Sequence, residues 1–164
     1  MRIRSASTKD IPAISELIEP LAAKRILLGK ELVMLYEAVQ EFVVAEKDGI
    51  VVACGALHVF WDDLGEVRSL AVADNFKTRG IGGAILEFLE TRARSLGLKR
   101  IFCLTFEVEF FSHHGYVEVK DWIVDPEVYV ELVRSPDEGV AEFLNLARVK
   151  PNTLGNSRML KELT

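Results

Sequence analysis

The sequence predicts a single domain of the α/β class, in which a mixed β-sheet carries helices on both faces. Two observations predict this class. First, short apolar runs bounded by turn residues alternate with segments whose apolar residues recur at helical spacing. Second, the order of these predicted strands and helices along the chain is the order of a mixed sheet. The length of 164 residues suffices for one domain with a hydrophobic core.

Seven runs are predicted to form strands because they are short, rich in apolar residues and bounded by turn signals. They span residues 2–4, 42–46, 50–61, 66–72, 100–105, 116–123 and 157–163. Lys47-Asp48-Gly49 predicts a hairpin turn between the second and third runs. Gly55 predicts a bulge or a close approach of another segment. The run 100–105 is so apolar that we expect it at the centre of the sheet.

Five segments have the apolar spacing of helices. The first begins after Thr8, which has the residue type of an N-cap, and Pro20 is expected to kink or end it. The others span residues 31–39, 80–96, 107–114 and 125–146. Gly97 follows the third helix in the position of a C-terminal cap. Pro126 and Pro136 are expected to start helices in the last segment.

Composition excludes several classes of partner. The net charge of −5 argues against nucleic acid as the main partner, although it leaves room for a local basic site that binds an anion. The apolar runs are far shorter than the ~20 residues needed to cross a bilayer, so no membrane association is expected. The first residues contain no apolar core of a signal peptide, which favours a cytoplasmic protein. Cys54 and Cys103 are expected to be buried, reduced thiols; a disulfide or a nucleophile is the alternative.

Residues 66–89 carry the most specific signal in the chain. A short apolar strand is followed by a polar loop, by Gly80, Gly82 and Gly83, and by a helical run. Backbone N–H groups in the first turn of a helix lack intrahelical partners, and the helix dipole favours negative charge there. Because glycine has no side chain to hold a ligand away from the backbone, the loop predicts a site for a phosphate-bearing ligand.

Two common nucleotide-binding motifs do not match this loop. The Rossmann pattern needs a different glycine spacing and a preceding β-α unit, and a Walker A loop needs Lys-Ser/Thr after the glycines. The loop matches instead the motif Q/R-x-x-G-x-G/A, with which the GNAT superfamily of N-acetyltransferases binds the pyrophosphate of acetyl-CoA. The motif reads here Lys77-Thr78-Arg79-Gly80-Ile81-Gly82, with Lys in place of Gln or Arg.

Two further motifs extend the resemblance over residues 2–123. The apolar L-A-V that precedes the loop is Leu70-Ala71-Val72, and the motif F-Y/F-x-x-x-G-F/Y lies at residues 110–116. The opening S-T-K-D-I-P-A-I is also typical of the superfamily. The chain is therefore identified as a member of it. Membership implies one GNAT domain over residues 1–164, a mixed, mostly antiparallel sheet of about six to seven strands with helices on both faces, acetyl-CoA as co-substrate, and no metal.

The resemblance also implies how acetyl-CoA is held. Pantetheine would pair with the strand 66–72 as an added strand, where this strand and the strand 100–105 splay apart. The N–H of Leu70 would polarise the thioester carbonyl and stabilise the oxyanion. Phe111 stands where the family often has a tyrosine acid, so that acid is absent. The expected cofactor contacts are Leu70, Ala71, Val72, Lys77, Thr78, Arg79, Gly80, Ile81, Gly82, Gly83 and Phe111.

Glu66 and Thr105 are the expected catalytic side chains beside the backbone of Leu70. The attacking amine must lose a proton, and Glu66 lies on the same strand, four residues before Leu70, as a candidate base. A solvated carboxylate at the strand end is the alternative. Thr105, at the end of the facing strand, is the hydroxyl expected to serve the departing thiolate, or else an ordinary strand residue.

The chain also resembles a narrower group, the short stand-alone amino-acid N-acetyltransferases, which are similar to the acetyltransferase half of N-acetylglutamate synthase. The segments that carry this resemblance are the basic loop at 24–30, the runs 66–72 and 105–116, and the tail at 138–143 and 149–160, including a turn-rich loop at 151–156. It implies acetyl transfer to the α-amino group of L-glutamate, or L-glutamine, as the first step of arginine biosynthesis. The alternatives are another small amine, a protein N-terminus, or a module that binds acyl-CoA without turnover.

A glutamate pocket needs cations, because the substrate carries two carboxylates. In the synthase half, an Arg in the loop between the first two helices and an Arg/Ser pair on the last strand hold the substrate. The matching residues are Lys30, Ser157 and Arg158, and Arg68 and Ser69 on the catalytic strand are further candidates. A solvated face is the alternative for the basic loop. A homodimer is a further expectation, since last strands or helices often pair in this superfamily.

Overall fold

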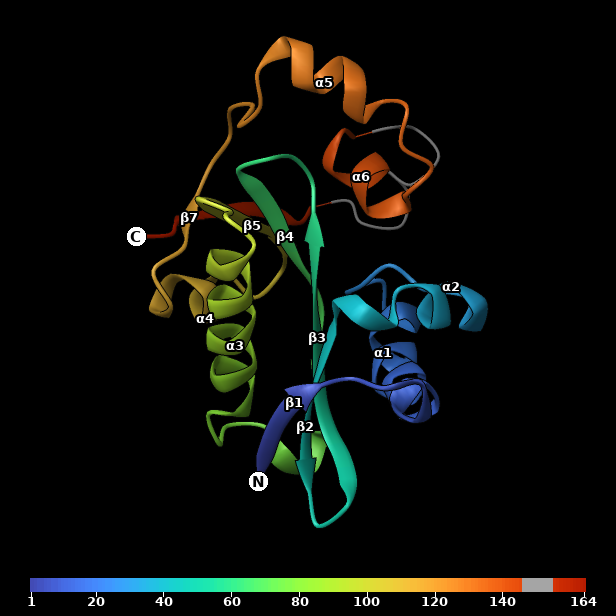
Figure 1. Cartoon of the computed structure of the whole chain (residues 1–164). Coiled ribbons are helices and arrows are strands. Elements are labelled where there is room, and N and C mark those ends of the chain that lie inside the picture. Colours follow the sequence, from blue (N-terminus) through green and yellow to red (C-terminus); the bar gives the residue numbers. More distant parts are fainter. Residues whose placement is uncertain (146–154) are drawn as a thin grey trace.

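A seven-stranded sheet forms the centre of the computed structural model, which describes residues 1–145 and 155–164 (Figure 1). The strands run in the order β1-β2-β3-β4-β5-β7-β6. Every neighbouring pair among them is antiparallel except β4 and β5, which are parallel, so the predicted mixed, mostly antiparallel sheet is confirmed. The strands are β1 (Arg2–Ser5), β2 (Phe42–Lys47), β3 (Ile50–Val59), β4 (Leu64–Val72), β5 (Arg100–Thr105), β6 (Val117–Glu118) and β7 (Ser157–Glu162).

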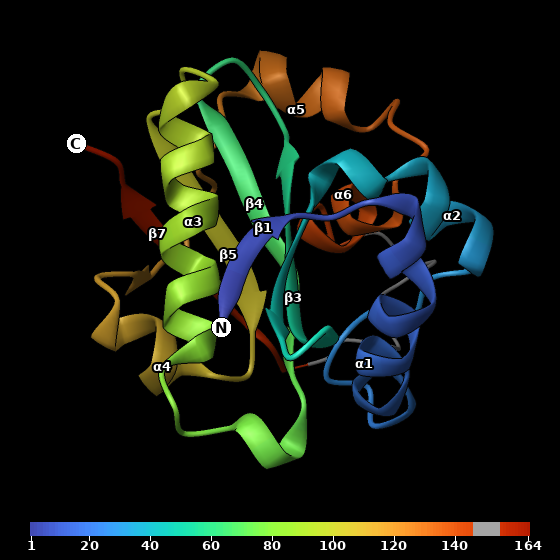
Figure 2. The same ribbon diagram turned by 60° about the horizontal axis from the view of Figure 1, so that its bottom comes forward.

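Helices cover both faces of this sheet, with α3 on one side and α1 and α2 on the other (Figures 1 and 2). The helices are α1 (Ile11–Ala23), α2 (Leu32–Glu37), α3 (Ile81–Ser95), α4 (Val108–His113), α5 (Pro126–Leu132) and α6 (Glu138–Phe143). Short 3₁₀ turns span Thr8–Asp10, Val39–Glu41 and Asp74–Phe76. Successive strand residues point to opposite faces, so each strand serves two cores. On β5, Ile101 packs toward α3, whereas Phe102 packs with α5 and α6.

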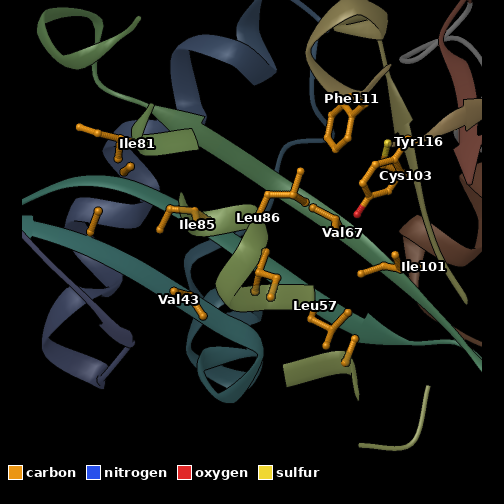
Figure 3. Packing of buried hydrophobic residues seen from close by; sticks show 14 of the residues in the cluster. Val43, Leu57, Val67, Ile81, Ile85, Leu86, Ile101, Cys103, Phe111 and Tyr116 are labelled. Carbon is orange, nitrogen blue, oxygen red and sulfur yellow. The ribbon is translucent and has the colours of Figure 1, made fainter. Parts of the chain in front are cut away.

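The core beneath α3 is the largest apolar cluster of the described chain, and Figure 3 shows how its side chains interlock. Ile81, Ile85 and Leu86 of α3 lie against Val43, Leu57 and Val67 of the sheet, all of them buried. Burying each of these side chains contributes roughly 1.5–3 kcal/mol. The cluster fixes α3, and with it the glycine loop at its start, against β3 and β4.

The start of α1 differs in detail from the expectation. Ser7, not Thr8, caps the 3₁₀ turn Thr8–Asp10 that leads into α1: its hydroxyl and its backbone N–H both lie near Asp10 Oδ2, at 3.0 and 2.7 Å. A carboxylate three residues after the cap can reach back to the cap N–H, and Asp10 does so here. Pro20 does not end α1, which continues to Ala23 before the chain turns into the basic loop.

The C-terminal third has less regular structure than the sequence pattern suggested. The predicted strand 116–123 is reduced to the two residues of β6, and the ring of Tyr116 is buried in the core instead. Pro126 starts α5 as expected. Pro136 does not start α6, because Asp137 caps that helix by accepting a hydrogen bond from Val140 N–H at 2.9 Å. The end of the predicted helix at 146 and most of the loop 151–156 lie outside the described residues.

Cys54 and Cys103 are free and buried, as predicted, and burial raises the pKa of Cys54 to about 12. Within the part of the chain that the structure describes, no helix is both long and apolar enough to span a membrane.

Candidate active site

The two parallel strands separate halfway along the sheet and open a cavity. β4 and β5 pair from Leu64 with Arg100 to Glu66 with Phe102. Beyond these pairs β4 continues to Val72 and β5 continues to Thr105 without pairing with each other. The ends of both strands line one cavity of about 640 Å³. A separated strand edge can pair with an amide-rich ligand in place of a strand. The predicted splay between these strands is therefore present.

A β-bulge lies in β4 beside the cavity. The register of β3 and β4 shifts between residues 54 and 56, so Gly55 stands opposite two residues, Ser69 and Leu70. Ser69 has a φ of 56°, in the left-handed region that is uncommon for non-glycine residues. The extra residue thus belongs to β4, whereas Gly55 admits the close approach of α3: a Cβ there would lie 2.8 Å from Ile85 Cγ2. A bulge re-aims backbone groups away from the ladder, as an oxyanion donor at Leu70 N–H requires.

The glycine loop, residues 77–83, lines the same cavity as the ends of β4 and β5. α3 begins directly after Gly80, which has a φ of 76°, and Thr78 also has a positive φ, 64°. A Cβ on Gly83 would lie 2.6 Å from Nε2 of His114, so α4 packs tightly against the first turn of α3. The first-turn N–H groups of this 15-residue helix face a cavity that could hold a pyrophosphate.

The predicted cofactor residues gather along this cavity with one exception. Its lining includes Leu70, Ala71, Val72, Lys77, Thr78, Gly80, Ile81, Gly82, Gly83 and Phe111. Arg79 is not among the lining residues in the described chain; its guanidinium lies 5.5 Å from the centroid of the Phe76 ring. These residues keep their predicted role as cofactor contacts, and their convergence on one cavity is what such a role requires.

A second, smaller cavity of about 40 Å³ adjoins the first, and we call it the acceptor cavity. Both cavities are lined by Val67, Arg68 and Ser69 of β4. The acceptor cavity is further lined by Glu66 and by Lys30, which lies at the end of the basic loop. Four of the residues predicted to serve catalysis or acceptor binding (Glu66, Arg68, Ser69, Lys30) therefore meet at one place, next to the end of the cofactor cavity.

Glu66 is held by Arg68, its neighbour on the same face of β4. Arg68 Nε donates to Glu66 Oε2 at 2.9 Å, and Arg68 Nη2 donates to the same oxygen. Burial raises the pKa of Glu66, which is 4% exposed, while the charge of Arg68 opposes this increase. A buried carboxylate with a raised pKa has the proton affinity that a general base at neutral pH needs.

Arg68 also contacts the start of α6. Its Nη1 donates to Asp137 Oδ2 at 3.0 Å. Burial works against the charge of Asp137, but the hydrogen bond and charge of Arg68 outweigh it and lower the Asp137 pKa to about 2. Gly139, two residues further, leaves room for the guanidinium, because a Cβ there would lie 2.6 Å from Arg68 Cζ. Arg68 is therefore an ion-pair partner of two carboxylates within the cavity wall.

A second carboxyl group lines the acceptor cavity from α6. Glu142 Oε1 accepts a hydrogen bond from Asn156 Nδ2 at 2.8 Å. Burial and the nearby charge of Glu66 raise the pKa of Glu142 to about 8. The sequence marked neither Glu142 nor Asp137 as a site residue. They are about 70 residues from β4 in sequence, so no local spacing connects them to it.

Three further predicted residues, Thr105, Ser157 and Arg158, are not among the described residues that line the acceptor cavity. Thr105 lines the cofactor cavity, and its Oγ1 accepts a hydrogen bond from Glu107 N–H at 2.9 Å. Ser157 Oγ donates to Glu118 at 3.1 Å. Arg158 donates to the Phe143 carbonyl at 2.7 Å and stacks over the Phe143 and Trp122 rings. In the described residues neither Ser157 nor Arg158 lines either cavity.

His114 is a further contact of the cofactor cavity that the sequence did not mark as a site residue. It lines that cavity, and its Nδ1 lies 2.8 Å from the carbonyl oxygen of Phe110. That oxygen can only accept, so Nδ1 carries the hydrogen. The signal that could have found it is the motif at 110–116, which places it directly before Gly115.

The sequence matches the acetyltransferase (GNAT) family over residues 15–118. The chain belongs to this family. Among proteins named amino-acid acetyltransferase, the GNAT chain is 56% identical to one from Mycobacterium tuberculosis, over 96% of this chain and 92% of the relative. It is 37% identical to one from Azotobacter vinelandii, over 70% of this chain. It spans only 27% of the length of that second relative.

Solved structures agree with this membership. A Mycobacterium tuberculosis protein in complex with CoA and NLQ superposes with a TM-score of 0.96 at 54% identity, and both chains are covered completely. N-acetylglutamate synthase from Neisseria gonorrhoeae, complexed with coenzyme A and N-acetyl-glutamate, gives a TM-score of 0.80 at 27% identity, over 99% of this chain and 35% of that one. The predictions of a GNAT fold and of an acetyltransferase that uses acetyl-CoA are confirmed.

Proposed function

We propose that this GNAT enzyme transfers the acetyl group of acetyl-CoA to the α-amino group of L-glutamate or L-glutamine, the first step of arginine biosynthesis. The observation that carries the proposal is the junction of the two cavities: Val67, Arg68 and Ser69 belong to both, so an amino acid in the acceptor cavity would lie next to the thioester. Similarity to proteins named amino-acid acetyltransferase supports an amino-acid acceptor. The resemblance to a synthase solved with N-acetyl-glutamate supports glutamate or a close analogue.

The proposed reaction begins with loss of a proton from the acceptor. Glu66, in the wall of the acceptor cavity, takes this proton directly or through water. The neutral amine nitrogen then forms a bond to the thioester carbon. Lys30, which lines the same cavity, pairs with a carboxylate of the acceptor and so orients the amino group.

The bulge in β4 serves the next step of the proposed reaction. Attack converts the thioester carbonyl to an oxyanion, and the N–H of Leu70 donates a hydrogen bond to it. The C–S bond then breaks, and CoA leaves as a thiolate. Thr105 lines the cavity on the facing strand, where its hydroxyl can donate a hydrogen bond to the sulfur. The thiolate then takes up, directly or through water, the second proton that the former amine nitrogen gives up as the amide forms. The products are CoA and the N-acetyl amino acid.

A thiol-release assay tests the proposed function. The purified protein is mixed with acetyl-CoA and each of the free amino acids in turn, and CoA is detected by its thiol. We expect release with L-glutamate, L-glutamine or both, and an N-acetylated product of matching mass. Turnover of other amines with both of these amino acids inert would overturn the narrower assignment.

A further inference from the structure

One proton must leave the active site in every turnover of the proposed reaction. An acceptor that binds as an ammonium ion loses two protons before it becomes an amide. One of them ends on the thiol of CoA, and Glu66 takes the other. Glu66 must release that proton before it can act again, yet its side chain is buried. It opens on the acceptor cavity, which the product fills at that stage, so the proton needs another exit.

The groups around Glu66 differ in their capacity to take a proton. Arg68 stays charged and has no acceptor atom. Asp137 has a pKa of about 2 beside Arg68, so it takes up a proton poorly. Burial and the charge of Glu66 give Glu142 a pKa of about 8, so it already holds a proton at neutral pH. Burial raises the pKa of the Cys103 thiol, which is therefore protonated as well. These four side chains cannot serve as the exit.

His58 is the direct neighbour of Glu66 across the sheet. The register of β3 and β4 pairs the two residues, so their side chains leave the same face with Cβ atoms about 4.5–5.5 Å apart. The Phe60 ring borders both strands on this face: its centroid lies 5.7 Å from that of the His58 ring and 5.9 Å from Arg68 Cζ. Burial raises the pKa of Glu66, and Arg68 and then a positive charge on His58 oppose this rise. His58 is therefore a close neighbour of the carboxyl group.

Glu41 holds His58 on the side that faces solvent. Nδ1 of His58 lies 2.7 Å from Oε1 of Glu41, which directly precedes β2. A carboxylate oxygen can only accept, so Nδ1 carries the hydrogen and Nε2 of the neutral ring is free to accept a proton. The side chains of His58 and Glu41 are 22% and 30% exposed, against 5% for that of Glu66. Exposure thus increases from Glu66 to His58 to Glu41.

We propose that His58, oriented by Glu41, receives the proton of Glu66 and passes it to solvent. The O–H bond of Glu66 breaks and an N–H bond forms at Nε2 of His58, directly or through water. An imidazole takes up and releases a proton near neutral pH, and the carboxylate of Glu41 stabilises the imidazolium until it gives a proton to water. This inference rests on the proposed function and adds the route by which its base recovers. Within the described residues His58 lines neither cavity, so it acts through Glu66.

The test compares kcat in wild type, His58→Ala, Glu41→Gln and His113→Ala by thiol release, at low buffer concentration and saturating substrates. His113 is an exposed histidine of α4 that is not among the described residues lining either cavity, so its variant is the matched control. We expect His58→Ala to lower kcat about tenfold with an unchanged KM for acetyl-CoA. Added imidazole should restore kcat, because the free base can carry the proton. Glu41→Gln should lower kcat less, and His113→Ala should keep it.

Rescue by imidazole separates a proton route from a structural role, since imidazole does not repair a fold defect. His58→Gln is a second variant, which can still donate to Glu41 but cannot carry a proton, and it should be as slow as His58→Ala. The inference is overturned if either variant keeps the wild-type kcat, or if imidazole leaves the kcat of His58→Ala unchanged. A wild type that acetylates neither L-glutamate nor L-glutamine is instead a failure of the proposed function, and it is distinct from both of these results.

Discussion

Arg68 Nε lies 2.9 Å from Oε2 of Glu66, two residues earlier on the same face of β4. The second hydrogen bond from Arg68, through Nη2, goes to the same oxygen. Neither bond uses Oε1, so Arg68 orients the carboxylate without occupying the oxygen that would accept a proton. This geometry makes Glu66 the natural place to test the proposed chemistry.

Glu66→Gln removes the base and keeps the size of the side chain. General-base catalysis contributes typically ~10²–10⁴-fold, so we expect kcat to fall by that order with little change in the KM for acetyl-CoA. Thiol release measures both. Glu162→Gln, on the exposed end of β7, is the matched control and should keep wild-type kinetics. An unchanged kcat in Glu66→Gln would show that another group takes the proton.

Gly139→Ala tests whether α6 positions Arg68. A Cβ at residue 139 would lie 2.6 Å from Arg68 Cζ, so the guanidinium or the helix must move. Overpacking of this kind costs about 1–3 kcal/mol, and displacement of Arg68 should also lower kcat. A double-mutant cycle tests the contact: the free energy of unfolding is measured by chemical denaturation for Gly139→Ala, Arg68→Ala and the double variant. The cycle isolates the energy of the steric clash between the two residues. We expect the double variant to be more stable than the sum of the single effects predicts; simple additivity would contradict the contact.

Gly83→Ala tests the glycine loop as the cofactor site. Its Cβ would lie 2.6 Å from His114 Nε2 and would line the cavity at the first turn of α3. We expect the Kd for CoA, measured by calorimetry, to rise about tenfold, which is ~1.4 kcal/mol. Adding His114→Ala separates the causes: recovery of binding points to the ring, and persistence points to direct obstruction of the ligand. Unaltered affinity in the single variant would place the pyrophosphate elsewhere.

The glycine loop could be predicted from sequence because its signal is local. Three glycines stand at the start of a helical pattern: Gly80, Gly82 and Gly83. The N-terminus of a helix binds an anion through its own backbone N–H groups, so no residue distant in sequence is needed to predict the site. The same holds for the strands and for α3, whose periodicities are clear along the chain. The cap before α1 was misplaced by one residue, because Ser7 and Thr8 are both good caps and only the contact of Asp10 with Ser7 decides between them; a 3₁₀ turn, Thr8–Asp10, then precedes α1.

The part of the acceptor cavity that α6 contributes could not be predicted in this way. The ion pair of Arg68 with Asp137 joins residues 69 positions apart, and it depends on how α6 packs against β4. Glu142 looked like an ordinary helical carboxylate, since burial appears only in the folded chain. Gly55 predicted a bulge or a close approach of another segment. The close approach, by Ile85 of α3, is at Gly55 itself, whereas the extra residue of the neighbouring bulge is in β4.

The buried carboxyl of Glu142 gives a pH dependence with a definite sign. Burial and the charge of Glu66 raise its pKa to about 8 in the folded chain, from an ordinary value of 4.5. Between these values the folded state holds a proton that the unfolded state has lost, so a rise in pH favours unfolding. At about 1.4 kcal/mol per pKa unit, the penalty is on the order of 3 kcal/mol, after allowance for partial exposure, once the pH exceeds about 8.

Glu142→Gln removes this titration, since an amide stays neutral. We expect its free energy of unfolding relative to wild type to increase steadily from pH 5 to pH 9, as measured by urea denaturation at each pH. Contributions from groups that titrate in both proteins cancel in this difference to first order. Glu138→Gln, on the exposed side of the same helix, should show a flat difference across the same range. A flat difference for Glu142→Gln as well would mean that its carboxyl is ionised in the folded enzyme throughout, and that burial does not hold its proton.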